Sequence, residues 1–333
     1  MVERHKLVVV GGGPAGYTAA LYAARANLQP LCIEGYAAGG MLMTTGTVEN
    51  YPGAGEGALG PELVQVMRDQ AERFGTHFVT KDVTQIDLST WPFRLTIVGA
   101  EIEAEALIVG TGATAKRLGL PSEDALEFYG VGYCVACDGA LFEGKRVAVV
   151  GGGDSAMDQA MSLAKIAREV LLIHRREDFR ASEIMVDYAR AHENISFLAP
   201  HTVQEILGVD EGHVTGVRLQ DERDGSERVE QLDGVFVSIG HVPATELFCP
   251  FLDHDEHGYL TVIPGTTITS VPGVFAAGDV HDRVYRQVVT AASFGCMAAI
   301  DAERWLGHRG GWTSNRAGSG KAGGADPVPA PPA

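Results

Sequence analysis

Two short apolar runs dominate the hydrophobic pattern, because each is uninterrupted and each ends in three glycines. Residues 7–10 read LVVV and precede Gly11-Gly12-Gly13, and residues 147–150 read VAVV and precede Gly151-Gly152-Gly153. A strand buried on both faces of a parallel sheet has such a run, without alternating polar positions. Small residues after each glycine group predict a helix. The pattern therefore predicts two copies of one unit, a strand followed by a tight turn and a helix.

The glycine spacing suggests what these units bind. Both match the G-x-G-x-x-G/A spacing of dinucleotide-binding turns: Gly11, Gly13 and Gly16, then Gly151, Gly153 and Ala156. Such a turn brings the backbone close to a pyrophosphate, and the free N–H groups at the start of the helix attract the phosphates. One such match could be only a structural turn. Two matches, each directly after a predicted strand, favour two nucleotide sites.

The end of the second strand in each unit, where the adenine ribose is normally bound, differs between the copies. Glu34 stands there in the first copy and can accept hydrogen bonds from a ribose 2′-hydroxyl, as FAD or NAD presents. His174 stands there in the second, next to Arg175 and Arg176 and followed by Arg180. Guanidinium groups suit a 2′-phosphate. The alternative is a solvated basic face. We expect FAD in the first site and NADPH in the second.

The rest of the chain repeats one plan in both halves. Strand pairs are predicted at 93–98 with 101–105 and at 214–220 with 228–232, and each leads into a buried strand, 106–112 or 234–240. An amphipathic helix is predicted over 60–75, which we expect to be scaffold without chemistry. Residues 272–279 read as a late strand and turn, whose Asp279 can hydrogen-bond a ribityl hydroxyl. The predicted fold is α/β, with two doubly wound, Rossmann-like dinucleotide-binding domains.

Composition excludes several classes of function. The chain has 333 residues, 45% hydrophobic, and a formal charge of −17, so it lacks the broad cationic surface needed to bind nucleic acid or an anionic membrane. Residues 7–24 carry no charge, but Gly11 to Pro14 would break a membrane-spanning helix. No apolar leader precedes the first strand, so we expect a cytoplasmic protein. The Ala-, Gly- and Pro-rich tail, 313–333, is expected to be disordered.

The cysteines add a candidate reactive site. Cys32, Cys249 and Cys296 stand alone, whereas Cys134 and Cys137 form a C-x-x-C pair followed by Asp138. A zinc site would need a second ligand pair, which the sequence does not offer at finger-like spacing, so we expect no metal. Buried structural thiols are a further alternative. The redox interpretation is favoured, because two thiols in one turn can close a disulfide and Asp138 can move the proton. Electrons would pass from NADPH to the flavin and then to the disulfide.

The order of these motifs resembles the bacterial low-molecular-weight thioredoxin reductases over about residues 5–306. The matching segments are 11–20 (GGGPAGYTAA), 48–53 (VENYPG), 134–139 (CVACDG), 174–181 (HRREDFRA), 273–279 (GVFAAGD) and 285–287 (YRQ). The resemblance implies a discontinuous FAD-binding domain, 1–117 with 245–312. An NADPH-binding domain, 118–244, would be inserted into it and would carry the C-x-x-C pair. It also implies a homodimer and thioredoxin, or a thioredoxin-like protein, as the partner. The insert would rotate, presenting first the disulfide and then the nicotinamide to one flavin face.

The resemblance also implies site residues, carried over by motif. Catalytic roles fall to Cys134 and Cys137, with Cys137 nearer the flavin, and to Asp138 as acid and base. FAD contacts fall to Gly11, Gly13, Pro14, Ala15, Gly16, Glu34, Gly39, Gly40, Thr45, Asn50, Val83, Thr111, Gly112, Asp279, Arg286, Gln287 and Val288. NADPH contacts fall to Gly153, Asp154, Ser155, His174, Arg175, Arg176, Arg180, Ile239, Tyr259 and again Arg286.

Four departures from the family pattern bear on these expectations. Met41 replaces a usual Gln beside the flavin, Gly110 replaces an Ala, and Ser293-Phe294 replaces two smaller residues. Ala140-Leu141 replaces a Phe-Phe pair that the family uses to hold thioredoxin, with Phe142 retained beside it. The last departure leaves a small-molecule disulfide open as an alternative substrate. A flavin-dependent dithiol oxidase and a ferredoxin-driven reductase are disfavoured by Asp138 and the arginine cluster, and a non-turnover flavin redox sensor by the C-x-x-C pair.

Overall fold

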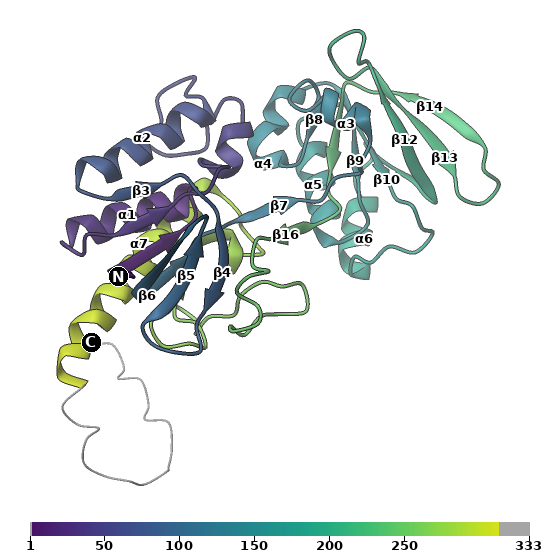
Figure 1. Ribbon diagram of the computed structural model, residues 1–333. Coiled ribbons are helices and arrows are strands. Elements are labelled where there is room, and N and C mark those ends of the chain that lie inside the picture. Colours follow the sequence, from purple (N-terminus) through teal and green to yellow (C-terminus); the bar gives the residue numbers. More distant parts are fainter. Residues whose placement is uncertain (1, 313–333) are drawn as a thin grey trace.

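The computed structural model describes residues 2–312, so the expected tail at 313–333 lies outside the described residues. Two units lie side by side, joined by a pair of antiparallel strands, β7 (Ala113–Ala115) and β16 (His241–Pro243) (Figure 1). We call them the first unit, which holds both ends of the described chain, and the second unit, which holds the middle. No helix within the described residues is long and apolar enough to cross a membrane.

The first unit is built on a seven-stranded sheet. Its strand order is β3-β2-β1-β6-β5-β4, and β17 pairs with β6 beyond the end of β5. The strands are β1 (Glu3–Val10), β2 (Leu31–Ile33), β3 (His77–Val79), β4 (Val83–Asp87), β5 (Phe93–Ile97), β6 (Ala100–Val109) and β17 (Val274–Ala276). Because β17 pairs with β6, the chain returns to the first sheet after it has built the second unit.

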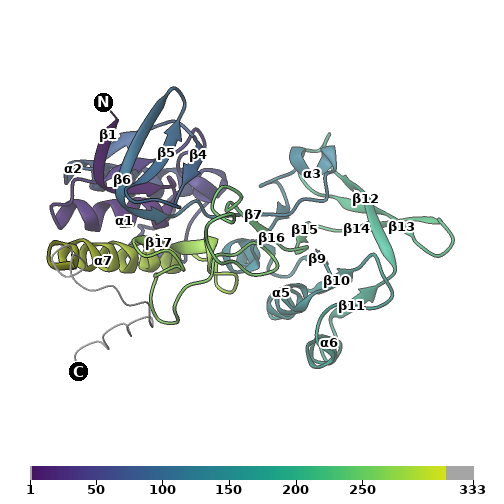
Figure 2. The same ribbon diagram turned by 60° about the horizontal axis from the view of Figure 1, so that its bottom comes forward.

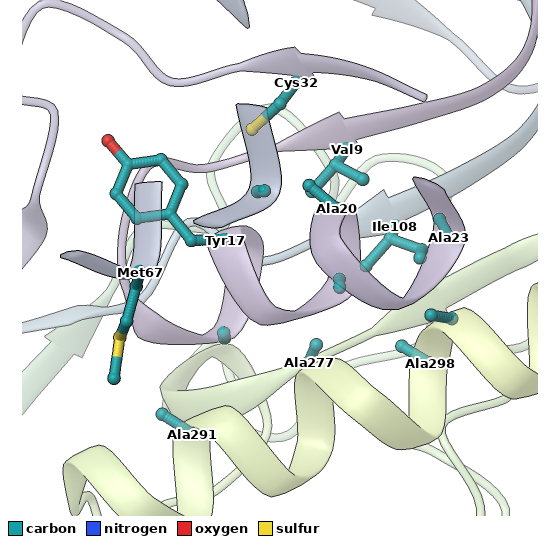
Figure 3. Close-up of a cluster of buried hydrophobic side chains, with 14 of the residues drawn as sticks. Val9, Tyr17, Ala20, Ala23, Cys32, Met67, Ile108, Ala277, Ala291 and Ala298 are labelled. Atoms are coloured by element: carbon teal, nitrogen blue, oxygen red, sulfur yellow. The ribbon is translucent and has the colours of Figure 1, made fainter. Parts of the chain in front are cut away.

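Helices cover this sheet, and two of them pack unusually closely. They are α1 (Pro14–Arg25), α2 (Gly60–Arg73) and α7 (Val288–Trp312), with short 3-10 turns η1 (Gly40–Thr44) and η3 (Gly278–Val280). Figure 2 shows α7 running alongside α1 on one face of the sheet. A Cβ at Gly295 would lie 2.2 Å from the Ala15 carbonyl oxygen, so only glycine permits this approach. Small side chains such as Ala20, Ala291 and Ala298 fill the seam (Figure 3).

The second unit contains a five-stranded parallel sheet with the order β11-β10-β9-β15-β8 and a separate antiparallel sheet. The parallel strands are β8 (Val131–Gly132), β9 (Arg146–Val150), β10 (Glu169–Ile173), β11 (Ile195–Leu198) and β15 (Gly234–Val237). The antiparallel strands are β12 (His201–Leu207), β13 (Gly216–Asp221) and β14 (Glu227–Gln231). The helices are α3 (Pro121–Ala125), α4 (Val135–Asp138), η2 (Gly139–Phe142), α5 (Asp154–Ala164) and α6 (Glu183–Arg190).

The predicted α/β class and the two Rossmann-like units are confirmed, and several details differ. The two strands predicted at 101–105 and 106–112 are one strand, β6, because its first half pairs with β5 and its second half with β17. Strand β12 was not predicted, since its apolar and polar positions do not alternate regularly around the register shift between Val203 and Glu205. The apolar face of the helix predicted over 60–75 does not extend to its end, because Val64 is buried but Phe74 is 39% exposed.

Candidate active site

The glycines of the first turn have two different roles. Gly11 and Gly16 allow close backbone contacts, whereas Gly13 leaves open space beside the helix. A Cβ at Gly11 would lie 2.1 Å from the Gly110 carbonyl oxygen, and one at Gly16 would lie 2.0 Å from the Gly11 oxygen. Gly13 differs, because a Cβ there would meet nothing within 4 Å in the described structure. Gly13 is also the N-cap of α1. Its open side therefore lies where the free N–H groups of the helix can receive a phosphate.

The second glycine turn repeats this division. A Cβ at Gly151 would lie 2.3 Å from the Ser238 carbonyl oxygen, and one at Gly152 would collide with the His174 ring. Gly153, the N-cap of α5, again has open space. Its backbone φ of −103° is close to the −101° of Gly13. Both turns thus offer a helix N-terminus with room beside its capping glycine, and they fit the phosphates of two dinucleotides.

Near the first turn, the expected FAD segments lie close together. Gly39 donates its N–H to the Gly12 carbonyl oxygen at 2.6 Å, and a Cβ at Gly40 would lie 3.5 Å from the Gly13 Cα. Val83 begins a strand on the far edge of the sheet. The residue before it, Asp82, accepts a hydrogen bond from the Tyr36 N–H, which brings this segment beside the loop after Glu34. These contacts surround the start of α1.

Glu34 is buried, and its carboxylate is already fully engaged by protein donors. Oε2 accepts from the Tyr17 hydroxyl and from Arg68 Nε, and Oε1 accepts from Arg68 Nη2 and from Thr80 Oγ1. Burial alone would raise the pKa of Glu34, but the bonds from Arg68, Thr80 and Tyr17 outweigh it and hold the pKa below its usual value. A ribose hydroxyl at Glu34 would have to share the carboxylate with these donors.

Arg68 was missed by the sequence reasoning, which treated the helix at 60–75 as scaffold. The structure adds a contact with the predicted site, because Arg68 binds Glu34 and also lies over the Phe78 ring and beside Glu72. In the sequence, Arg68 is one arginine in an amphipathic helix, and such an arginine is usually exposed to solvent. Tyr17 and Thr80 offered no stronger signal.

At the second turn, the arginines and His174 occupy different environments. His174 is buried and stacks on Phe179 with ring centroids 5.0 Å apart. Burial lowers its pKa, a backbone hydrogen bond at Asp178 opposes this, and the charges of the three arginines lower the pKa further, so the neutral ring is favoured. His174 therefore fills the space above Gly152 and does not supply positive charge.

The three arginine side chains are exposed, and none of them forms an ion pair within residues 2–312. Arg180 is placed by its own backbone, whose N–H donates to the Gly152 carbonyl oxygen at 2.7 Å. Asp154, expected at the same site, accepts hydrogen bonds from both N–H and Oγ of Ser182 and so ties α5 to the start of α6. The positive charge beside the second turn thus comes from the arginines.

Cys134 and Cys137 form a disulfide across a single turn, which we call the redox turn, residues 134–138. The N–H groups of Cys137 and Asp138 both donate to the Cys134 carbonyl oxygen at 3.1 Å. Burial raises the pKa of the Asp138 carboxyl above its usual value. An aspartic acid that keeps its proton to higher pH can donate that proton to a neighbouring sulfur.

Two side chains of the first unit contact the redox turn. Asn50 Nδ2 donates to the Ala136 carbonyl oxygen at 3.4 Å and to Gln287 Oε1 at 3.2 Å. Gln287 Nε2 lies 3.9 Å from Cys134 Sγ. The disulfide therefore lies against two residues that the resemblance assigned to FAD, although they are far from it and from each other in sequence.

The segment after β17 supplies an unpartnered buried acid. Asp279 Oδ1 is buried and has no hydrogen-bond partner among the described residues. Burial, reinforced by Asp282 and opposed by Arg286, raises the pKa of Asp279 to about 7. Its neighbour Gly278 packs against Ala15, where a Cβ would lie 2.8 Å from that side chain. A polar group bound beside α1 would satisfy this carboxyl, which fits a ribityl hydroxyl.

Several expected contacts already have other partners or lie apart from the cluster. Thr45 Oγ1 donates to the Met41 carbonyl oxygen, and Thr111 Oγ1 donates to that of Ala244. Gly112 accepts from the Ala244 N–H, so Thr111 and Gly112 join the two connections between the units. Tyr259 is buried in the first unit, where its N–H donates to Asp255. Ile239 packs against the core of the second unit.

Comparison with known proteins shows the family to which the chain belongs. The model of the pyridine nucleotide-disulphide oxidoreductase family matches residues 5–295. A thioredoxin reductase of Mycolicibacterium smegmatis is 51% identical over 303 residues, 91% of this chain and 96% of that protein. A bifunctional thioredoxin reductase/thioredoxin of Mycobacterium leprae is 49% identical over 93% of this chain and 68% of its own length. The solved structure of thioredoxin reductase from Giardia duodenalis superposes with a TM-score of 0.87 at 40% identity, covering 92% of this chain and 99% of that one.

Proposed function

Because this chain belongs to the pyridine nucleotide-disulphide oxidoreductase family and reduces the disulfide of thioredoxin with NADPH and FAD, we propose how its own residues divide that work. The observation that carries the proposal is the position of the Cys134–Cys137 disulfide. It lies in contact with Gln287, which immediately precedes α7, the helix that packs against α1. Bound FAD supplies a two-electron relay between NADPH and a disulfide.

FAD is held by the first unit. The N-terminus of α1 binds the pyrophosphate at Gly13, where a side chain would fill the open space. Asp279 hydrogen-bonds the ribityl chain, since its buried Oδ1 has no other partner. Glu34, which Arg68 keeps ionised and oriented, accepts a hydrogen bond from the adenosine ribose of FAD.

NADPH is held by the second unit. The open side of Gly153 at the start of α5 receives the pyrophosphate, and Arg175, Arg176 and Arg180 receive the 2′-phosphate. His174 supports this site by filling the space above Gly152. Tyr259 and Arg286 belong to the first unit, so they can contact NADPH only where the two units meet.

Asp138 manages protons at the redox turn. When the disulfide bond of Cys134 and Cys137 accepts two electrons, two sulfurs must take up protons or stay as thiolates. Asp138 follows Cys137 directly and has a raised pKa, so it donates a proton in this step and recovers one when the dithiol is oxidised again.

The domain division, assembly and location follow the same interpretation. We propose an FAD-binding domain of residues 1–117 with 245–312 and an NADPH-binding insert of 118–244, which the β7 and β16 connection supports.

We propose a homodimer, supported by apolar residues left exposed around α2, namely Met43, Leu59 and Val66. A reductase that draws on NADPH is proposed to work in the cytoplasm, where thiols are kept reduced.

Cysteine variants test the proposed electron path. Cys134→Ser or Cys137→Ser should abolish NADPH oxidation driven by thioredoxin, while NADPH still bleaches the flavin under anaerobic conditions. Cys249→Ser, a cysteine remote from the redox turn, serves as the matched control and should keep both activities. Thioredoxin turnover by either redox-turn variant would show that the pair is not the redox centre.

A further inference from the structure

Two neutral side chains of the first unit, Asn50 and Gln287, which we call the amide pair, form hydrogen bonds with the redox turn. Asn50 comes from the loop between η1 and α2, and Gln287 immediately precedes α7. Asn50 Nδ2 bridges the Ala136 carbonyl oxygen and Gln287 Oε1, and Gln287 Nε2 points to Cys134 Sγ. The amide pair thus contacts both a cysteine sulfur and the backbone between the cysteines.

The hydrogen bonds between the amide pair and the redox turn are long and therefore weak, so the turn can detach from the first unit reversibly. The hydrogen bonds to the redox turn measure 3.4 Å to oxygen and 3.9 Å to sulfur, at the long end of such interactions. No salt bridge joins the redox turn to the first unit in the described part of the chain. Figure 1 shows α4, which carries the redox turn, on the side of the second unit that faces the first.

The chemistry requires this attachment to open. The two sulfur atoms must receive electrons beside the flavin, and a thiolate must then attack the thioredoxin disulfide along its sulfur–sulfur axis. Cys134 Sγ lies against Gln287 of the first unit, so we expect the turn to leave the first unit before thioredoxin reaches this sulfur. Residues that hold it there determine how often it is free.

We propose that Asn50 and Gln287 are positioning residues that hold the redox turn on the first unit and set the fraction of molecules in which it is released to thioredoxin. The proposal rests on the proposed function, but it concerns an equilibrium that exists with or without turnover. Losing one neutral hydrogen bond to the turn should shift that equilibrium towards release by about two- to tenfold, and losing both by about four- to a hundredfold.

Thiol accessibility measures this equilibrium directly. The FAD-loaded protein is reduced with dithiothreitol, desalted anaerobically and treated with iodoacetamide, and the alkylation of each cysteine is followed by mass spectrometry. Asn50→Leu and Gln287→Met remove the amides at nearly constant size, and the double variant removes both. We expect Cys134 and Cys137 to react about two- to tenfold faster in each single variant and about four- to a hundredfold faster in the double variant.

Internal controls separate release from general loosening. Cys32, Cys249 and Cys296 should keep their wild-type rates in a variant that only releases the redox turn. Gln204→Met, an amide on β12 that bonds to Gln220 and Thr202, is the matched control and should leave all five rates unchanged. FAD titration reports any separate loss of flavin affinity. Gln287→Glu, which cannot donate to Cys134, replaces Gln287→Met if the latter does not fold.

Steady-state kinetics give the second readout. A released turn meets thioredoxin more often but the flavin less often, so the variants should show a lower KM for thioredoxin together with a lower kcat. A purely structural defect would lower kcat and leave KM unchanged or raised. Wild-type alkylation rates at Cys134 and Cys137 in a folded, FAD-loaded double variant would overturn the proposal. If the wild type did not oxidise NADPH with thioredoxin, the proposed function would fail, while the alkylation comparison would still decide this one.

Discussion

Arg68 holds the buried carboxylate of Glu34 with two hydrogen bonds, from Nε to Oε2 at 2.9 Å and from Nη2 to Oε1 at 3.1 Å. The Glu34 side chain is 2% exposed, and that of Arg68 is 24% exposed. The pair connects α2 to the end of β2, beside the first glycine turn. Removing the arginine would leave a buried charge with only the hydroxyl donors of Tyr17 and Thr80.

The Arg68–Glu34 pair predicts that removing the arginine destabilises the protein more than neutralising the glutamate. Arg68→Met should lower the free energy of unfolding of the FAD-free protein by about 1 to 3 kcal/mol, because Glu34 keeps its charge but loses its cation. Glu34→Gln should cost less, about 1 kcal/mol, since the partly exposed Arg68 can turn to water. Urea titration measures both. Arg73→Met, on the exposed face of the same helix, is the control, and equal losses for Arg68→Met and Arg73→Met would contradict the prediction.

Cofactor preference is predicted from the second glycine turn. Two charge-assisted contacts to a 2′-phosphate, at about 1.5 to 3 kcal/mol each, should favour NADPH over NADH by on the order of a hundredfold or more in kcat/KM. Arg175→Ala combined with Arg176→Ala should remove most of this preference by lowering the value for NADPH while sparing that for NADH. Arg168→Ala, an exposed arginine elsewhere in the second unit, is the control. A wild type with equal kcat/KM for the two nucleotides would refute the assignment.

Asp279 predicts a pH dependence of stability. Its pKa of about 7 in the folded protein lies above the usual value near 4 in the unfolded chain, so the folded state binds the extra proton between these values. Its contribution to stability is therefore fully present below about pH 4 and is lost as pH rises to about 7. Each pKa unit is worth about 1.4 kcal/mol, so the loss can reach a few kcal/mol.

The comparison with Asp279→Asn isolates this contribution from all other titrating groups. Between about pH 5 and 8, the FAD-free wild type should lose more unfolding free energy than the variant. Asp210→Asn, on an exposed turn after β12, should follow the wild type. Parallel pH profiles for wild type and Asp279→Asn would show that the carboxyl is ionised throughout this range.

Features set by a few consecutive residues could be predicted from the sequence. The runs before Gly11 and Gly151 gave β1 and β9, because a doubly buried strand needs apolar residues at every position. The glycine spacing identified both turns, since Gly11 and Gly16 are required by backbone contacts within a few ångströms. The C-x-x-C pair identified the redox turn for the same reason, because a disulfide between residues three apart forms within one turn.

Contacts between distant segments could not be predicted in this way. Asn50 and Gln287 are 237 positions apart, and only the folded chain brings both to the redox turn. Arg68 looked like a solvated helix residue, although it binds a carboxylate 34 positions away. His174 stood where a phosphate ligand was expected, but its ring is needed to fill the space above Gly152. Motif spacing relates residues that are near one another in the sequence. It does not show which distant residues come into contact in the folded chain.

The surface beside the redox turn leads to the last prediction, which concerns thioredoxin docking. Leu141 is 70% exposed, whereas Phe142 is only 8% exposed and packs edge-on against Phe236 with ring centroids 5.1 Å apart. Phe142 is therefore part of the core of the second unit and cannot replace the aromatic pair that Ala140 and Leu141 lack. The apolar area available to thioredoxin here is that of Leu141, with little from Ala140.

Restoring the aromatic side chains should improve docking. A fully buried Phe is worth about 1.5 to 3 kcal/mol, so Ala140→Phe with Leu141→Phe should raise kcat/KM for a common bacterial thioredoxin by about ten- to a hundredfold. Reduction of a small aromatic disulfide, which needs no protein interface, should change little. Ile184→Phe adds an exposed aromatic ring on α6 of the same unit and serves as the control. No gain with thioredoxin, or an equal gain with Ile184→Phe, would mean that docking depends on other residues and that the Ala140-Leu141 surface does not select the substrate.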